Sequence, residues 1–95
     1  MFALAGTWSM DADMRQRQAE VLPGLVDGVR QIPGFVRGFW SDDLDDPDVS
    51  VTFIVFETLE QAQSFRDAVI ANAPTQATVG VERNTLRIVE VKADA

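Results

Sequence analysis

The chain has 95 residues, enough for one domain spanning 1–95, and it carries 15 acidic against eight basic residues, a formal charge of −7. The field of such a surface repels phosphate backbones, so we expect neither nucleic acid nor a membrane surface as a partner. The chain has no Cys and no His, which excludes disulfides and the usual zinc ligands, and we expect no metal.

The N-terminal residues lack the basic segment and the long apolar run of a secretory signal or a membrane span. Together with the absence of Cys, this favours a cytoplasmic protein. A chain of this length buries a small core when it folds alone, and neither a disulfide nor a metal is available to compensate. Self-association is the remaining common means of stabilisation.

Residues 2–9 alternate between two faces, which predicts a strand. Asp11 or Asp13 can cap the helix that follows, whose apolar residues recur at helical spacing until a Pro-Gly pair ends it. Pro23 lies inside this helical pattern, where it removes a backbone donor and clashes with the preceding turn. We therefore expect a kink or a break near Leu22.

The rest of the chain continues with shorter elements. In order, the sequence predicts a strand over 35–41, an Asp-rich connection over 42–48, a strand over 49–57, a helix over 59–73 capped by Thr58, an irregular segment with extended pieces over 77–85, and a strand over 86–91. The order β-α-β-β-α-β is typical of the ferredoxin-like fold. The expected class is α+β, with a four-stranded antiparallel sheet and two helices on one face.

The third strand is apolar on both faces. One face carries Val49, Val51, Phe53 and Val55, and the other carries Ile54 and Phe56. A strand that is apolar on both faces is expected to be buried on both, whereas two helices cover only one face of the sheet. An identical sheet from a second copy would cover the other, and two-fold dimers are the commonest oligomers. The alternative is a monomer whose segment 74–85 folds across the open face.

Three sequence features carry a resemblance to a known family. They are Thr7-Trp8 at the end of the first strand, the run Ile32-Pro33-Gly34-Phe35-Val36-Arg37-Gly38-Phe39-Trp40, and Glu57-Thr58-Leu59-Glu60-Gln61-Ala62 at the start of the second helix. With the order of the elements, they make the chain similar to the antibiotic biosynthesis monooxygenase-like family of the dimeric α+β barrel superfamily. The resemblance implies a homodimer whose two sheets form a barrel, with a pocket near the helices of each protomer.

Members of that superfamily include cofactor-free oxygenases of polycyclic phenols and quinols, haem-degrading enzymes, isomerases and proteins without known activity. Haem-degrading members use a His as the iron ligand, and this chain has no His, Cys or Tyr to take that place. We therefore expect no cofactor. Cofactor-free members carry Trp, Asn and often Tyr, His or Arg around a bound aromatic molecule. Here Asn occurs only at Asn72 and Asn84, so no catalytic residue can be singled out.

Five residues are candidates for ligand binding: Trp8, Trp40, Arg37, Thr52 and Arg87. The two Trp side chains could stack on an aromatic ligand, although packing in a core or a dimer interface is their commoner role. The two Arg side chains lie inside strands and could hold an anionic or phenolate ligand, or form ion pairs with acidic residues. The Thr52 hydroxyl could bind a ligand or a backbone carbonyl.

The Asp-rich connection does not match a calcium loop, because it lacks the central Gly and the distal Glu. A solvated hairpin turn is the expected structure. We also find no nucleophile–base pair and no phosphate-binding Gly-rich loop.

Two functional hypotheses remain. The first is a dimeric barrel that binds a small apolar or aromatic molecule and could act on it as a cofactor-independent monooxygenase-like enzyme. The alternative is a non-catalytic dimeric scaffold or partner-binding module. Cavity volume separates them: an open cavity lined by Trp, Thr and Arg favours the first hypothesis, and a cavity filled by Phe39, Trp40, Phe53 and Phe56 contradicts it.

Overall fold

The computed structural model describes residues 1–95 as four strands and three α-helices, preceded in one case by a short 3₁₀ turn. The strands are β1 (Phe2–Met10), β2 (Phe35–Asp42), β3 (Val49–Phe56) and β4 (Val81–Glu90), and the helices are α1 (Arg15–Arg30), α2 (Leu59–Ala71) and α3 (Ala73–Ala77). All neighbouring strands are antiparallel, in the order β2-β3-β1-β4. The predicted α+β class and ferredoxin-like order are confirmed.

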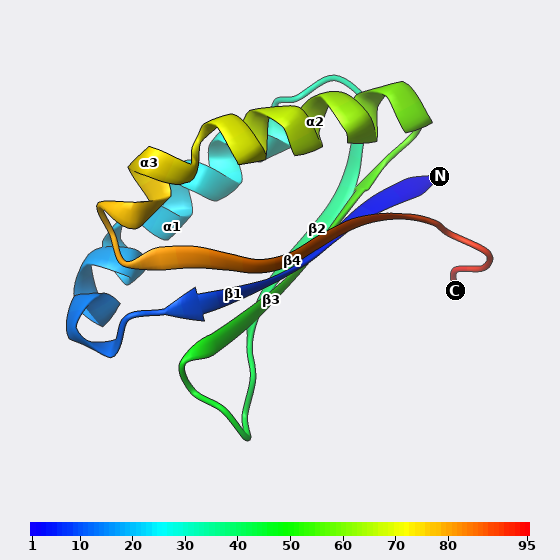
Figure 1. Cartoon of the computed structure of the whole chain (residues 1–95). Helices are drawn as coiled ribbons and strands as arrows, with labels where there is room; N and C mark the ends of the chain where they lie inside the picture. Colours follow the sequence, from blue (N-terminus) through cyan, green and yellow to red (C-terminus); the bar gives the residue numbers. More distant parts are fainter.

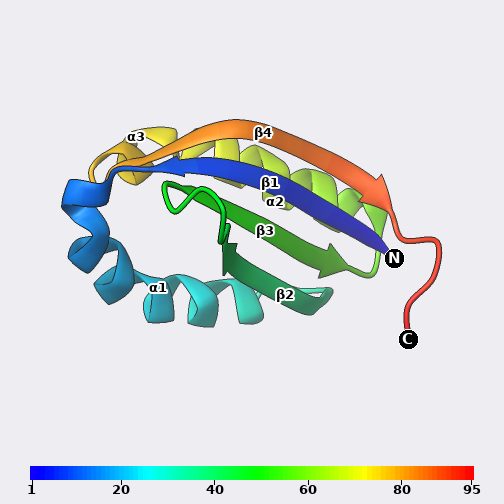
Figure 2. The ribbon, with the colours of Figure 1, turned by 90° about the horizontal axis from the view of Figure 1, so that it is seen from below.

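The three helices lie on one side of the twisted sheet, and the other side carries no element of this chain (Figure 1). α2 contacts β1, β3 and β4, whereas α1 contacts the sheet chiefly along β2. The view from below shows α1 and α2 over opposite halves of the sheet (Figure 2). The two long helices are therefore set apart over part of their length.

The buried core lies between the C-terminal end of α1 and the start of α2. Its centre consists of Val29, Ile54, Phe56 and Ala62. The Phe56 ring has no exposure and packs against two further rings, with centroids 6.3 Å from Phe35 and 5.2 Å from Phe65. Only nine of the 95 residues are buried, so this core is small for a chain of this length.

Asp11 caps the helical turn ahead of α1, because its side chain accepts a hydrogen bond from the Asp13 backbone N–H at 3.0 Å, whereas α1 itself has no side-chain cap. A 3₁₀ turn over Ala12–Met14 follows and leads into α1. α1 runs without interruption through Pro23, so a break near Leu22 does not occur. Pro23 is exposed, and the carbonyl that it leaves without a helical donor can be hydrated by solvent.

The region after α2 differs from the prediction. Pro74 follows the end of α2 and lies in the first turn of a further helix, α3. The first N–H groups of a helix have no partner within it, so the missing N–H of Pro74 breaks no helical hydrogen bond. β4 begins at Val81 rather than at residue 86, because Gly80 turns the chain back with a φ of 73°. The register of β1 with β4 shifts beside Asn84, so the polar segment joins the sheet through an irregularity rather than remaining a loop.

The open face of the sheet stays uncovered in the single chain. Phe39, Val51 and Phe53 are 53%, 41% and 38% exposed on it. The segment 74–85 does not fold across this face, because α3 packs beside α2 and β4 on the side of the helices (Figure 1). The prediction that this segment could cover the open face is therefore wrong. None of the helices combines the length and the apolar character needed to cross a membrane.

Candidate functional site

A cavity of about 540 Å³ lies between the helices and the sheet. Its floor is formed by side chains of β1, β2 and β3, and α1 and α2 provide its walls. The main lining residues are Trp8, Trp40 and Thr52 on the floor, Val21 and Leu25 on α1, and Val69 on α2. The volume lies within the range of cavities that hold small organic molecules. The lining is mostly apolar, as in sites for apolar or aromatic ligands.

A glycine determines where the first indole lies. Trp8 projects from β1, and its ring folds back over Gly6, two residues earlier on the same face. A Cβ added at Gly6 would lie 2.9 Å from the Trp8 Nε1 atom and 3.0 Å from the Thr52 Oγ1 atom. In this position the indole N–H donates a hydrogen bond of 3.0 Å to the Thr52 hydroxyl. Trp8 is 8% exposed.

The second indole follows the same pattern on β2. The Trp40 ring folds back over Gly38, where an added Cβ would lie 2.9 Å from its Cζ3 atom. Trp40 pairs with Thr52 in the register of β2 with β3, and Gly6 pairs with Thr52 on the other side. The floor of the cavity thus carries two indoles with the Thr52 hydroxyl between their strands.

Most other polar groups along the cavity already have protein partners. Ser50 donates its hydroxyl proton to Asp42 at 2.8 Å. The Gln18 side-chain amide donates to the backbone carbonyls of Asp11 and Val79, at 3.0 Å each, and so joins α1 to the turn before β4. These bonds hold the wall of the cavity in place and leave few groups free to bind a ligand.

The charged residues along the cavity lie at its solvent-exposed edge. Arg15 pairs with Asp48 at 3.1 Å and Arg17 pairs with Glu20 at 3.4 Å, and both Arg side chains are more than half exposed. Exposed pairs of this kind contribute little to stability. The interior of the cavity therefore has no charge of its own, which suits a neutral ligand.

The structure brings together three of the five predicted binding residues. Trp8, Trp40 and Thr52 line the one cavity. Arg37 pairs with Val55 and Arg87 pairs with Ala5, which places both Arg residues on the open face of the sheet. They therefore do not join the other three, because strand alternation sends their side chains to the opposite side.

Sequence reasoning missed the α1 residues of the lining, Gln18 among them, which the helical pattern marked as ordinary core or surface positions. A signal for the two indoles is present, however, in the repeated Gly-x-Trp spacing at residues 6–8 and 38–40. In a strand this spacing puts both residues on one face, so the glycine leaves room for the ring.

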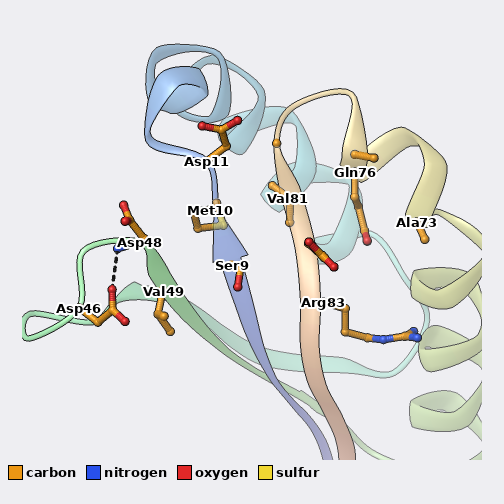
Figure 3. Close-up of a pocket in the computed structure, with 13 residues that line it drawn as sticks. Ser9, Met10, Asp11, Asp46, Asp48, Val49, Ala73, Gln76, Val81 and Arg83 are labelled. Carbon is orange, nitrogen blue, oxygen red and sulfur yellow. Dashed lines mark hydrogen bonds between the residues drawn. The ribbon is translucent and has the colours of Figure 1, made fainter.

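A second depression of about 770 Å³ lies at the end of the sheet where β1 meets the turn before β4 (Figure 3). Asp11, Asp46 and Asp48 contribute carboxylates, and the backbone N–H of Asp48 donates to Asp46 at 3.2 Å. The Arg83 side chain points away from them (Figure 3). No group of three or more His, Cys, Asp or Glu side chains is arranged to hold a metal ion.

No protein-family model matches the chain, and no curated protein sequence is significantly similar to it. Solved structures are similar in fold. A protein from Nitrosomonas europaea described as a putative antibiotic biosynthesis monooxygenase superposes with a TM-score of 0.77 at 17% identity, over 98% of this chain and 100% of that one. This chain has the antibiotic biosynthesis monooxygenase fold.

Two further structures share this monooxygenase fold and have different activities. The haem degrader MhuD from Mycobacterium tuberculosis, with two haems in its active site, has a TM-score of 0.76 at 16% identity, over 100% of this chain and 99% of that one. SnoaB, a cofactor-independent oxygenase from Streptomyces nogalater, has a TM-score of 0.72 at 13% identity, over 98% and 94%. At these identities the likeness establishes the fold and not the activity.

Haem does not fit the donor set of this cavity. The chain contains no His, Cys or Tyr, the side chains that serve as the first axial ligand of haem iron. Met10 is the single sulfur donor in the lining, and a thioether serves haem iron as the partner of a His. The resemblance to the haem degrader therefore extends to the scaffold and not to the ligands of the iron.

Proposed function

We propose that the protein is a homodimer that binds a small apolar or aromatic molecule in the cavity between its helices and its sheet. The observation that carries the proposal is the open cavity of about 540 Å³ whose floor holds two indoles. Indole faces stack on planar aromatic molecules, and the apolar walls favour ligands with little charge.

The aromatic side chains that could have filled the cavity lie elsewhere. Phe39 and Phe53 are on the open face of the sheet, and Phe56 is in the buried core. Trp40 lines the cavity without closing it. This arrangement favours ligand binding over the alternative of a scaffold with a filled interior.

The dimer is supported by the small core and the open apolar face. With nine of 95 residues buried, the single chain leaves much of its apolar surface in water. A second copy of the sheet, packed face to face, would remove Phe39, Val51 and Phe53 from solvent. Placement of this dimer in the cytoplasm stays a prediction.

If the ligand is also a substrate, the reaction that we propose is cofactor-independent monooxygenation, the activity of the structurally similar SnoaB. In such a reaction a phenol-type substrate supplies the electrons, one oxygen atom of O₂ enters the substrate and the other leaves as water. The titratable side chains along the cavity are Arg15, Arg17 and Asp42, all at its exposed edge. The substrate would therefore have to be acidic enough to lose its proton to water or to this edge.

A binding protein without catalysis is the second candidate. It is favoured by the interior of the cavity, where no carboxylate or imidazole stands ready to take a proton from a bound substrate. The two candidates share the cavity and the dimer and differ only in the fate of the ligand.

Native mass spectrometry of gently purified protein, followed by an oxygen-uptake assay, tests the proposal. We expect twice the mass of the chain with a discrete small-molecule adduct. With anthrone as the probe, an oxygenase takes up one O₂ for each anthraquinone and water formed. Binding of anthrone without oxygen uptake assigns the binding role, and a monomer that binds no aromatic probe contradicts the proposal.

A further inference from the structure

The hydroxyl groups along the cavity differ in whether they already donate a hydrogen bond to the protein. Ser50 donates to Asp42, and Thr78 donates to the Thr75 carbonyl at 2.6 Å. Ser41 and Thr75 are exposed and face water. Thr52 is half-buried, and its hydroxyl is not engaged as a donor to the protein.

The Thr52 hydroxyl has one role already assigned. Its oxygen accepts the Trp8 indole proton at 3.0 Å, which uses one lone pair and fixes the oxygen on the floor of the cavity. An indole N–H is a donor only, so the Thr52 proton cannot point at it. The Thr52 hydroxyl donates to no acceptor in the protein. Because Thr52 lines the cavity, its proton is available to a ligand bound there.

A half-buried hydroxyl donor that has no partner in the protein and lies on the floor of an apolar cavity is a basis for selectivity. A ligand that offers an oxygen acceptor there gains a hydrogen bond in a site of low dielectric. A ligand of the same shape without an acceptor leaves the donor unpaired, and the unpaired group costs more than the bond itself contributes.

We propose that Thr52 is the specificity-determining residue of the cavity, and that its hydroxyl, held by the Trp8 indole, donates to the carbonyl oxygen of a planar aromatic ligand. This inference rests on the proposed binding function and names the class of ligand. Trp8 is a positioning residue, because its indole N–H orients the Thr52 hydroxyl. Gly6 has no side chain and therefore leaves space for the indole to reach Thr52.

The Trp40 indole N–H is the competing donor. It has no acceptor in the protein either, and Trp40 lines the same cavity. Its ring, however, lies over Gly38 and packs against the buried core, and no hydrogen bond to the protein fixes its orientation. Trp40 therefore provides a stacking surface, and its removal weakens all planar ligands alike.

Two probes with the same fused-ring skeleton separate these roles: 1-tetralone, which has one carbonyl oxygen, and tetralin, which has none. Their dissociation constants are measured by titration calorimetry for the full-length wild type and for Thr52→Val, Thr52→Ser and Trp40→Phe. The quantity compared is the ketone preference, the dissociation constant of tetralin divided by that of 1-tetralone. A substitution that weakens the binding of both probes by the same factor leaves this ratio unchanged.

We expect Thr52→Val to lower the ketone preference about fivefold, the effect of one hydrogen bond between neutral groups. Thr52→Ser keeps the hydroxyl and should keep the preference, and Trp40→Phe should weaken both probes by the same factor. The two indole N–H signals in a ¹H–¹⁵N spectrum should both shift on binding, which locates the probes in the cavity.

An unchanged ketone preference in Thr52→Val overturns the inference, while binding of tetralin in the cavity would leave the proposed function standing. A preference lost in Trp40→Phe and kept in Thr52→Val assigns the donor to Trp40 and also overturns it. If neither probe binds the wild type and neither indole signal moves, the proposed binding function fails, and the inference fails with it.

Discussion

At residues 6 and 38 the absence of a side chain decides where an indole can lie. Each glycine precedes a Trp by two positions on one face of a strand, and each Trp ring lies over its glycine. The larger consequence belongs to Gly6, because the folded-back Trp8 ring reaches Thr52 on the neighbouring strand. Local backbone space thus sets the polar geometry of the cavity floor.

Gly6→Ala should displace the Trp8 ring. The new Cβ would lie 2.9 Å from Nε1 of Trp8 and 3.2 Å from Cδ1 of Leu86, closer than van der Waals contact allows. Overpacking of this kind costs about 1–3 kcal/mol of stability. We expect the Trp8 indole N–H signal to move upfield as its bond to Thr52 is lost, together with a lower midpoint of denaturant unfolding.

Gly28→Ala is the matched control. A Cβ at Gly28 meets nothing within 4 Å, and the residue lies inside α1. This substitution should leave both indole signals in place and raise stability slightly, since Ala favours helix more than Gly by about 1 kcal/mol. If Gly6→Ala behaved like this control, the proposed placement of the Trp8 ring would be wrong.

At the scale of the elements, caps and glycine turns mark where helices begin and where strands resume. Thr58 and Gln61 form a capping box, in which the Gln61 N–H donates to the Thr58 hydroxyl at 3.2 Å and the Thr58 N–H donates to the Gln61 side chain at 3.1 Å. This box begins α2, which forms one wall of the cavity. α1 forms the other wall without interruption at Pro23.

Thr58→Ala should lower the free energy of unfolding by about 1 kcal/mol, because the backbone N–H of Gln61 loses the Thr58 hydroxyl as its acceptor at the start of α2. Chemical denaturation at a fixed protein concentration measures this loss. Ser64→Ala, on the exposed surface of the same helix, is the control and should change stability by less than about 0.5 kcal/mol. Equal effects of the two substitutions would show that the cap does not stabilise α2.

At the scale of the whole molecule, the sheet has two apolar faces and one set of helices. The helix side holds the small core and the cavity, while the open side exposes Phe39, Val51 and Phe53. Arg37 and Arg87 also lie on the open side, and neither forms an ion pair within the chain. In the proposed dimer they would face the second copy, where carboxylates of that copy could pair with them.

Phe53→Asp should convert the proposed dimer to a monomer. Phe53 lies on the open face of the third strand and is 38% exposed in the single chain, so the change places a carboxylate where the second sheet would pack. A buried charge without a partner should weaken association about 100-fold. Analytical ultracentrifugation over a range of concentrations measures this change.

Leu44→Asp serves as the control for that experiment. Leu44 is 97% exposed in the connection between β2 and β3 and should not alter association. A dimer that survives Phe53→Asp unchanged would contradict assembly through the open face.

The sequence by itself determined the order of the elements, the ends of most of them and the two-faced character of β3, because alternation, helical spacing, caps and Pro-Gly pairs act over a few residues. A break at Pro23 does not occur, and within 77–85 the strand β4 starts at Val81, because neighbouring segments decide whether a helix continues or a strand starts. Only the tertiary structure decided which candidates share a site. Strand register sends Arg37 and Arg87 to the open face, and the separation of α1 from α2 over the sheet leaves a cavity above Trp8, Trp40 and Thr52. A hydrophobic pattern shows that a side chain avoids water, but the space opposite that side chain depends on elements distant in the chain.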